Sequence, residues 1–451
     1  MQHGKMGRRL FPTSATAVTG AVLAGCGGPA PPLRAQPTVL TYAPSAQWKN
    51  PGGNWQQFLR PALDHFEAEH PGIRVQLAGF APGGGYLAEL LAGRAPDVFQ
   101  DYNIIPYLEA SHLLVDLNPL LKKDDIPRST WSSLQLDAFT DARGTFFLPR
   151  YMNCAVIAVN LGDLDARGLS YPDPEWTYAD AARLFAACTW NSGANRHYGF
   201  APIFDGQTLS GSAGPMPNTH YAAQTFGGSV MDETRLVCTL GDPRVAQALQ
   251  WWESLFWEGI AVGGRWANPF PGATFAEFET DRLYHAASQW IGHYKFMFMP
   301  LPRFPAGRMG WCGLAGHAIN AHARDVGAAW ALVKFLDAEP WYQRYRMRLL
   351  LVAPGMLSLW PEFEQVVIAV APGFRDRGLH WYAESATKWA RPGHYFKYDA
   401  SQAMAAINKT TAAIFQRKVD LTAGLRGVAR QVNAMETAAA AAAAARSPAV
   451  V

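Results

Sequence analysis

The sequence is poor in charged residues: Lys, Arg, Asp and Glu make up 17% of its 451 residues, and the formal net charge is only +3. Lys5, Arg8 and Arg9, which lie in a first segment without any acidic residue, account for that whole surplus. Without this segment the chain is neutral, which argues against a nucleic-acid-binding protein, because such proteins need a basic surface. It also argues against adhesion of the whole surface to a membrane.

Several motifs are absent as well. No run of about 20 apolar residues could span a bilayer, and the sequence has no CxxC pair or zinc-ribbon spacing. HExxH, GxSxG, a P-loop and GxGxxG are also missing. The sequence therefore predicts a binding protein rather than an enzyme, with no cofactor and no metal. Glu277, Glu279 and Asp281 could supply the carboxylate pair of a glycosidase, but their alternation favours the solvated face of an amphipathic segment.

Tryptophan, by contrast, is abundant. The chain has 16 Trp, as many as Tyr and more than the 12 Met. Broad aromatic faces suit flat, amphipathic ligands. This composition predicts a binding site with aromatic walls for a neutral, partly apolar ligand.

The N-terminus has the organisation of an export signal. Residues 1–25 hold the basic start, a weakly apolar run and small residues. The stretch from Leu23 to Cys26 resembles a bacterial lipobox, which implies a lipid on Cys26, with residues 26–37 as a tether. Arg8-Arg9 also resembles a twin-arginine signal, so the export route stays open between that pathway and the general one. We expect an exported protein, held by lipid at the outer face of the cytoplasmic membrane.

The first hundred residues after the tether alternate strand and helix patterns, which predicts a parallel sheet. Ligands of such sheets bind beyond the carboxyl ends of the strands. This rule indicates residues 44–50 and 101–103. Further along, residues 274–284 are predicted helical and 286–290 extended, while 438–445 is either a frayed helix or a disordered tail.

Four cysteines follow Cys26: Cys154, Cys188, Cys238 and Cys312. An exported compartment permits disulfides, and four cysteines allow three pairings, among which the sequence does not choose. Buried free thiols are the alternative, particularly for Cys154 in its apolar strand.

The order of segments resembles that of the extracellular solute-binding proteins of bacterial ABC importers, particularly the sugar-binding group. The resemblance covers about residues 38–435 and is carried by six stretches: 66–75, 95–98, 113–117, 148–160, 242–259 and 328–336.

This resemblance implies an α/β fold of two lobes, like periplasmic binding proteins, each lobe a mostly parallel sheet flanked by helices and the two joined by a hinge. It places lobe 1 at residues 38–149, with 318–345 returning to it. Lobe 2 then takes residues 150–317 and much of 346–435, and 436–451 is an Ala-rich tail. The lobes would close on a ligand by hinge motion.

The resemblance also implies which residues face the ligand. Aromatic rings stack on the C–H faces of a sugar, and polar side chains bond its hydroxyls. Weaker candidates for ligand contact are Arg150, Asn153 and Tyr398. The alternative for Arg150 and Asn153 is that they form hydrogen bonds with backbone groups at the hinge. The candidate ligand-binding residues are Trp48, Asp101, Tyr102, Tyr151, Trp290, Trp311, His317 and Tyr395.

The implied function is capture of a mono- or oligosaccharide by a monomeric lipoprotein and its delivery to the permease of an ABC importer. Two alternatives stay open. One is binding of a different solute, such as a glycerol phosphate or a peptide; the other is a secreted carbohydrate-active enzyme.

Overall fold

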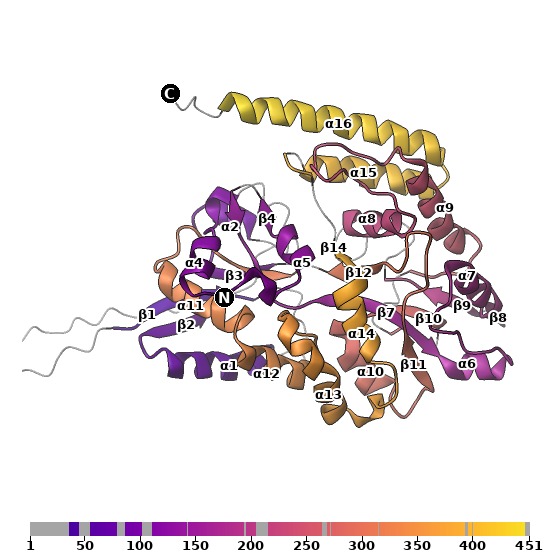
Figure 1. Cartoon of the computed structure of the whole chain (residues 1–451), viewed down its shortest axis with the longest axis horizontal. Coiled ribbons are helices and arrows are strands. Elements are labelled where there is room, and N and C mark those ends of the chain that lie inside the picture. The colour runs from indigo at the N-terminus through magenta and orange to yellow at the C-terminus, as the bar shows by residue number, and fades with distance from the viewer. Residues whose placement is uncertain are drawn as a thin grey trace, which may run out of the picture. The chain divides into compact units, whose positions relative to one another are not determined.

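A computed structural model gives the fold of the protein (Figure 1). It describes residues 36–44, 55–78, 86–101, 111–141, 143–193, 195–203, 215–263, 268–270, 272–313, 315–392, 396–398 and 400–446.

The first sheet begins with the predicted alternation of strands and helices. Within the described residues its strand order is β2-β1-β3-β13-β6. β1 pairs in parallel with β2 and β3, whereas β13 is antiparallel to β3 and β6. The strands are β1 (Thr38–Ala43), β2 (Ile73–Leu77), β3 (Val98–Asp101), β6 (Leu148–Pro149) and β13 (Gly316–Ile319).

Helices from two distant parts of the chain cover this sheet. One buried cluster joins α1 and α11 to the strands, with Phe66 and Phe335 in ring contact at 5.3 Å. A short hairpin, β4 (Thr140–Asp141) with β5 (Gly144–Thr145), lies beside α5. The helices are α1 (Trp55–Glu69), α2 (Leu87–Leu91), α4 (Asn118–Lys123), α5 (Ser133–Ala138), α11 (Val326–Asp337) and α12 (Pro340–Leu350).

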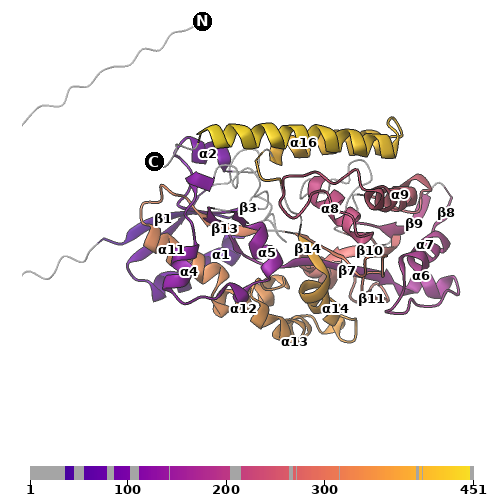
Figure 2. The same cartoon turned by 45° about the horizontal axis from the view of Figure 1, so that its top comes forward.

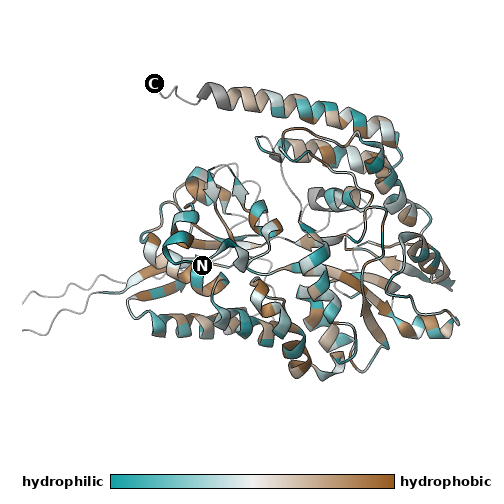
Figure 3. Ribbon diagram, viewed as in Figure 1, coloured by the Kyte–Doolittle hydropathy of each residue, from teal (hydrophilic) through white to brown (hydrophobic). Residues whose placement is uncertain are grey.

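The second sheet is centred on β7, which pairs with three strands. In the described part of the chain the order is β14-β12-β7-β10-β9-β8, with β11 also paired to β7. Figure 3 shows hydrophobic residues along these strands and alternating polarity on the helices around them. The strands are β7 (Asn153–Asn160), β8 (Trp190–Ser192), β9 (Asn195–Ala201), β10 (Ala273–Glu279), β11 (Phe296–Met299), β12 (Gly310–Gly313) and β14 (Ala390–Pro392).

Two groups of helices pack on this sheet, and each shares a separate buried cluster with it. The first group contains α7, α8, α9, α15 and α16, and the second contains α10, α13 and α14. The helices are α6 (Leu161–Ala166), α7 (Tyr178–Ala187), α8 (Pro215–Thr225), α9 (Pro243–Trp257), α10 (Leu283–Gln289), α13 (Trp360–Val370), α14 (His380–Glu384), α15 (Ala400–Phe415) and α16 (Leu421–Arg446).

The predicted two-lobe α/β fold is therefore confirmed, but both sheets are mixed rather than mostly parallel. β13 enters the first sheet directly from the second and runs antiparallel to its neighbours. β7 likewise enters the second sheet from β6 and is antiparallel to β10, β11 and β12. A strand that enters from the opposite lobe has no helical crossover to turn it into a parallel strand. The lobe bounds predicted from the sequence stay a prediction.

Local sequence signals place the longer helices. Thr177 and Asp180 form a reciprocal capping box at the start of α7. Asp242 accepts a hydrogen bond from the backbone amide of Arg244, and Pro243 occupies the first turn of α9. The Ala-rich residues 438–445 form the end of helix α16. The sequence had left open whether they are a frayed helix or a disordered tail. Figures 1 and 2 show α16 running from the side of α9 toward that of α2.

Two predicted segments have the opposite structure. Residues 273–279 form strand β10, not a helix, and 283–289 form helix α10, not a strand. The alternation of Phe275, Glu277 and Glu279 with small or aromatic residues has the period of a strand. Both faces of β10 are buried, so Glu277 and Glu279 are not on a solvated face.

Glu253 of α9 is a buried carboxylate without a partner. It is 1% exposed, and neither carboxylate oxygen has a hydrogen-bond partner among the described residues. Burial raises the pKa of this side chain to about 8. The folded protein therefore holds the proton more tightly than the unfolded chain, and stability falls as the pH rises from the ordinary glutamate pKa toward 8.

We expect Glu253→Gln to remove this loss of stability. At pH 8 the variant should be more stable than the natural chain by on the order of 2 kcal/mol, and at pH 4.5 the two should differ little. Thermal unfolding across this range measures the difference. Exposed Glu258→Gln at the end of the same helix is the control, and an equal gain at both pH values would contradict the prediction.

Candidate functional site

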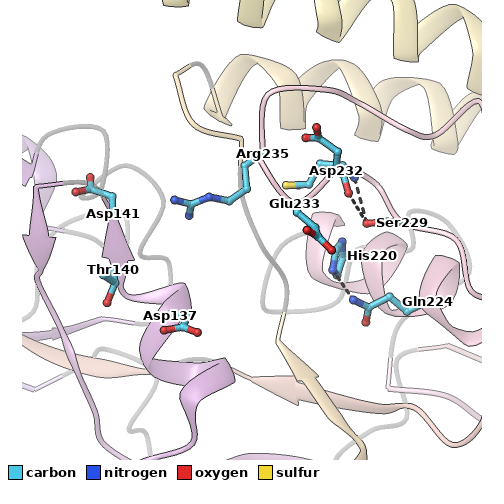
Figure 4. Close-up of a pocket in the computed structure, with 10 residues that line it drawn as sticks. Asp137, Thr140, Asp141, His220, Gln224, Ser229, Asp232, Glu233 and Arg235 are labelled. Atoms are coloured by element: carbon cyan, nitrogen blue, oxygen red, sulfur yellow. Dashed lines mark hydrogen bonds between the residues drawn. The ribbon is translucent and has the colours of Figure 1, made fainter. Parts of the chain in front are cut away.

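A cavity of about 490 Å³ lies between residues of the two lobes. Its volume is in the range of small-molecule sites. Figure 4 shows the two walls facing each other, with the side chain of Arg235 pointing across toward Asp141. The lining residues are Asp137, Thr140 and Asp141 from the first lobe, and His220, Gln224, Ser229, Met231, Asp232, Glu233 and Arg235 from the second.

The first-lobe wall consists of α5 and the β4–β5 hairpin, tied together by Arg128. Its guanidinium donates to the hydroxyls of Thr145 at 2.9 Å and Thr140 at 3.4 Å, and it lies 3.4 Å from the carboxylate of Asp137. Asp141 is paired with Arg143 at 2.6 Å. Both carboxylates of this wall therefore have a cation beside them, which lowers the cost of placing them near a neutral ligand.

The second-lobe wall is helix α8, held on its sheet by a buried glutamate. The hydroxyl of Tyr221 donates to Glu277 at 2.8 Å, and the backbone amide of Ile203 donates to the other carboxylate oxygen at 3.0 Å. Burial raises the pKa of Glu277 to about 7, against the effect of these two bonds. His220 and Gln224, one turn apart on the same helix, line the cavity and bond each other at 2.7 Å.

The loop that follows α8 completes this wall and is held by hydrogen bonds to Asp232 within it and to helix α16. Asp232 accepts hydrogen bonds from Thr234 and from the backbone amides of Leu236 and Val237. Asn433 of α16 accepts from the backbone amide of Cys238 at 2.6 Å and donates to its carbonyl at 3.3 Å. The C-terminal helix therefore positions the loop that carries Arg235.

In the described part of the chain three segments connect the lobes. Residues 150–152 lead from β6 to β7, residue 315 leads into β13, and residues 351–356 lead from α12 toward α13. The first connection lies within residues 148–160, one of the six stretches that carry the family resemblance.

Buried polar groups join these three segments into what we call the hinge network. The backbone amide of Arg150 donates to the carbonyl of Ala315 at 3.0 Å. The carbonyl of Arg150 accepts from Arg346 at 2.8 Å and from Gln343 at 3.3 Å. Gln343 in turn accepts from the backbone amide of Gly355 at 3.0 Å. The members of the network are Tyr42, Gln135, Arg150, His317, Asp337, Gln343 and Arg346.

Charge within the hinge network is balanced by burial and pairing. His317 lies between the hydroxyl of Tyr42 at 2.8 Å and the carboxylate of Asp337 at 2.8 Å. Burial lowers the pKa of His317. A neutral ring with its proton on Nδ1 satisfies both neighbours. Burial and the nearby Arg150 lower the pKa of Arg346 to about 10, so it remains charged at neutral pH.

The predicted ligand residues fall into separate places. Asp101 ends β3 opposite Gly316, Tyr151 and His317 lie in the hinge region, and Trp311 is buried in β12 beside Gly313. None of these four is among the described residues that line the cavity.

Two weaker ligand candidates, Arg150 and Asn153, form hydrogen bonds with other groups of the protein. Arg150 belongs to the hinge network, and Asn153 donates to Glu279 at 2.7 Å while its carbonyl accepts from Thr280 at 3.1 Å. Tyr398 is exposed, and its backbone amide donates to Glu436. Trp48, Tyr102, Tyr395 and the lipidation candidate Cys26 lie outside the described residues.

Trp290, predicted to stack on the ligand, is fully buried in the core of the second lobe. Its indole packs against Phe270 and Phe278 at 4.5 and 4.4 Å and donates to Asn268. Because α10 replaces the expected extended segment, the ring projects into the core, and we do not carry Trp290 into the proposed site.

The lining of the cavity differs from the predicted aromatic walls. Among the described lining residues there are four carboxylates and one arginine, but no Trp, Tyr or Phe. The sequence offered little signal for these residues, since they come from helices α5 and α8, strand β4 and the loop after α8, which only the fold brings together. The i, i+4 spacing of His220 and Gln224 is the one local pattern that could have indicated a shared face.

Comparison with known proteins decides the family. The model of the bacterial extracellular solute-binding protein family matches residues 46–341, about two thirds of the chain. The protein belongs to this family. As a solute-binding protein of an extracellular family, it is an exported protein. No curated protein matches it in sequence.

Solved structures share the fold of this solute-binding protein. The ABC substrate-binding protein Lmo0181 from Listeria monocytogenes, in complex with cycloalternan, has 17% identity and a TM-score of 0.69, and the match covers 89% of this chain and 99% of that one. A solute-binding protein from Thermotoga lettingae bound with α-D-tagatose has 16% identity and a TM-score of 0.69, with 88% and 100% covered. The sugar-binding protein MalE from Xanthomonas citri has 15% identity and a TM-score of 0.68, with 89% and 98% covered.

The described residues contain neither a membrane-spanning helix nor a cluster of metal ligands. No helix there is long and apolar enough to cross a membrane. No group of three or more His, Cys, Asp and Glu side chains in that part of the chain is placed to hold a metal ion.

Gly355 tests the packing of the hinge. A Cβ at this position would lie 2.6 Å from the carbonyl oxygen of Pro149 and 3.0 Å from that of Arg150. We expect Gly355→Ala to separate the first and third connections and to destabilise the protein by about 1–3 kcal/mol in thermal unfolding. Gly427 in α16 has open space around it, so Gly427→Ala is the control. Equal effects of the two substitutions would contradict the close packing.

Proposed function

We propose that this solute-binding protein captures a mono- or oligosaccharide between its lobes and delivers it to the permease of an ABC importer. The observation that carries the proposal is the cavity walled by residues of both lobes in a member of this family. Structural neighbours named for cycloalternan, tagatose and maltose support a carbohydrate as the solute.

The polarity of the cavity favours a neutral, hydroxyl-rich solute over an anion. Carboxylates of Asp137, Asp141, Asp232 and Glu233 accept hydrogen bonds from hydroxyl groups, and Arg235 and Gln224 donate. Arg128 and Arg143 balance Asp137 and Asp141, but Asp232 and Glu233 outnumber Arg235 in the described lining. The remaining negative charge disfavours a glycerol phosphate. Aromatic stacking by Trp48, Tyr102 and Tyr395 remains part of the proposal.

The protein itself performs no bond chemistry in this proposal. The sugar binds the closed arrangement of the lobes more tightly than the open one and shifts the population by that difference. The closed form then docks on the permease, and a separate ATPase supplies the transport energy. We further propose that the protein is a monomer, held at the membrane by lipid on Cys26.

A solute panel tests the proposal. We expect at least one carbohydrate among malto- and manno-oligosaccharides and ketohexoses to raise the melting temperature and change the tryptophan fluorescence, because a ligand stabilises the folded state by mass action. Glycerol phosphate, spermidine and a short peptide are the comparison solutes. A response to one of these and to no carbohydrate would overturn the assignment, and hydrolysis of a bound oligosaccharide would indicate an enzyme.

Arg235 tests the location of the site. Arg235→Met keeps the length of the side chain but removes its donors, so affinity for the carbohydrate found in the panel should fall roughly 10–100-fold in calorimetry. The melting temperature without ligand should stay the same. Arg183 on α7 is exposed and lies outside this cavity, so Arg183→Met should bind normally. Unchanged affinity of Arg235→Met would place the ligand elsewhere.

A further inference from the structure

Cys154 and Cys312 lie directly opposite each other on adjacent strands. β12 pairs with β7 in antiparallel orientation, and the register sets Cys312 against Cys154 and Gly313 against Asn153. Directly opposed residues of antiparallel strands have Cα atoms about 4.5–5.5 Å apart. A disulfide requires a Cα separation of about 4.4–6.8 Å. The backbone therefore already holds these two cysteines at bonding distance.

Both thiols also point to the same side of the sheet. Cys154 and Cys312 belong to the same buried cluster, which includes Tyr382 and Ala386 from the covering helices. Each is buried, and Cys312 is among the groups that raise the pKa of Cys154, after burial itself. The shared face, the shared cluster and this influence of Cys312 on Cys154 agree with the register.

The other two cysteines have no such partner in the described structure. Cys188 ends helix α7. Cys238 forms an isolated bridge with Met231, and its backbone is held by Asn433. No strand register in the described residues sets either of them against a cysteine. Of the three pairings that four cysteines allow, only the one containing Cys154–Cys312 has support from the topology.

We propose that Cys154 and Cys312, which are free thiols in the structure, are joined by a disulfide in the exported protein. An oxidising extracytoplasmic compartment permits this bond. In the reaction a disulfide-bonded oxidoreductase accepts two electrons and both thiol protons, becoming a dithiol, while the Sγ–Sγ bond forms and the two S–H bonds break. A mixed disulfide with the oxidant is the intermediate.

The timing of the reaction follows from burial. Only a thiolate attacks a disulfide, and burial raises the pKa of Cys312 to about 12, with that of Cys154 also raised well above its usual value. The folded, reduced pair is therefore inert. The bond forms while the chain folds, before helix α14 and the residues after it cover the sheet, and afterwards it resists reductants in solution.

The position of the bond gives it a structural role. The β7–β12 ladder has two residue pairs within the described residues. β7 follows the connection at residues 150–152, and β12 ends just before the connection that leads into β13. A covalent bond here would keep the two connections in register when the lobes move. This role does not depend on which solute the protein binds.

Thiol mapping tests the proposal. The full chain is exported into a bacterial periplasm, purified without reductant, unfolded in acid and guanidinium, and alkylated before and after reduction. Peptide mass spectrometry then reads each cysteine separately. We expect Cys188 and Cys238 to be alkylated completely without reduction, and Cys154 and Cys312 only after it. A linked peptide containing both, lighter than the reduced pair by two hydrogen atoms, completes the expectation.

Variants sharpen this test. Cys312→Ala should make Cys154 reactive without reduction, whereas Cys188→Ala should leave the linked peptide intact. The measurement on the natural chain stands alone if a variant fails to fold. Complete alkylation of Cys154 and Cys312 without reductant, or a link from either to another cysteine, would overturn the proposal.

Discussion

The carbonyl group of Arg150 is the point on which the two-lobe arrangement depends. It accepts hydrogen bonds from Gln343 and Arg346, and the amide of the same residue donates to Ala315. One peptide segment therefore joins all three connections between the lobes, because Gln343 also holds Gly355. Removing a partner from such a buried network would leave a charge or a carbonyl without its hydrogen bond, which costs more than the bond contributes.

Each wall of the cavity is attached to a rigid element. On the first lobe, α5 carries Asp137 into the cavity while Gln135 of the same helix donates to the carbonyl of Tyr151 at 3.0 Å. On the second lobe, Glu277 holds α8, and Asn433 holds the loop that carries Arg235. Movement at the hinge would consequently move each wall as a unit, and a ligand that contacts both walls can favour the closed arrangement.

The sequence predicted the parts of the fold that have local causes. The predicted alternation of strands and helices after the tether is confirmed in the first sheet, and the caps at Thr177 and Asp242 are further local causes of helix starts. The helix predicted at residues 274–284 is wrong, although the alternation in β10 has the period of a strand. The two Glu residues suggested a solvated face, and only tertiary packing buries both faces of this strand. The assignment of Trp290 to the ligand depended on a second error, the extended segment predicted at residues 286–290, where the structure has the end of helix α10.

The site was harder to predict than the fold. Asp137, His220 and Arg235 come from segments far apart in the chain, and nothing in their local sequence marks them as neighbours. The charged character of the cavity likewise depends on the fold, which brings Asp137 of α5 and Asp141 of β4 opposite Asp232, Glu233 and Arg235 of the loop after α8. The high Trp content led to the prediction of aromatic walls in the binding site. Most of the described aromatic rings, such as those of Trp252 and Trp290, instead fill the cores of the lobes.

The central claim is that a carbohydrate draws the two lobes together around the hinge network. Small-angle X-ray scattering of the mature chain, without ligand and with saturating amounts of the sugar that gives the largest thermal shift, tests it most directly. The account predicts a smaller radius of gyration with sugar, and a smaller response in Gly355→Ala. A radius of gyration that stays constant while calorimetry shows the sugar bound would contradict it.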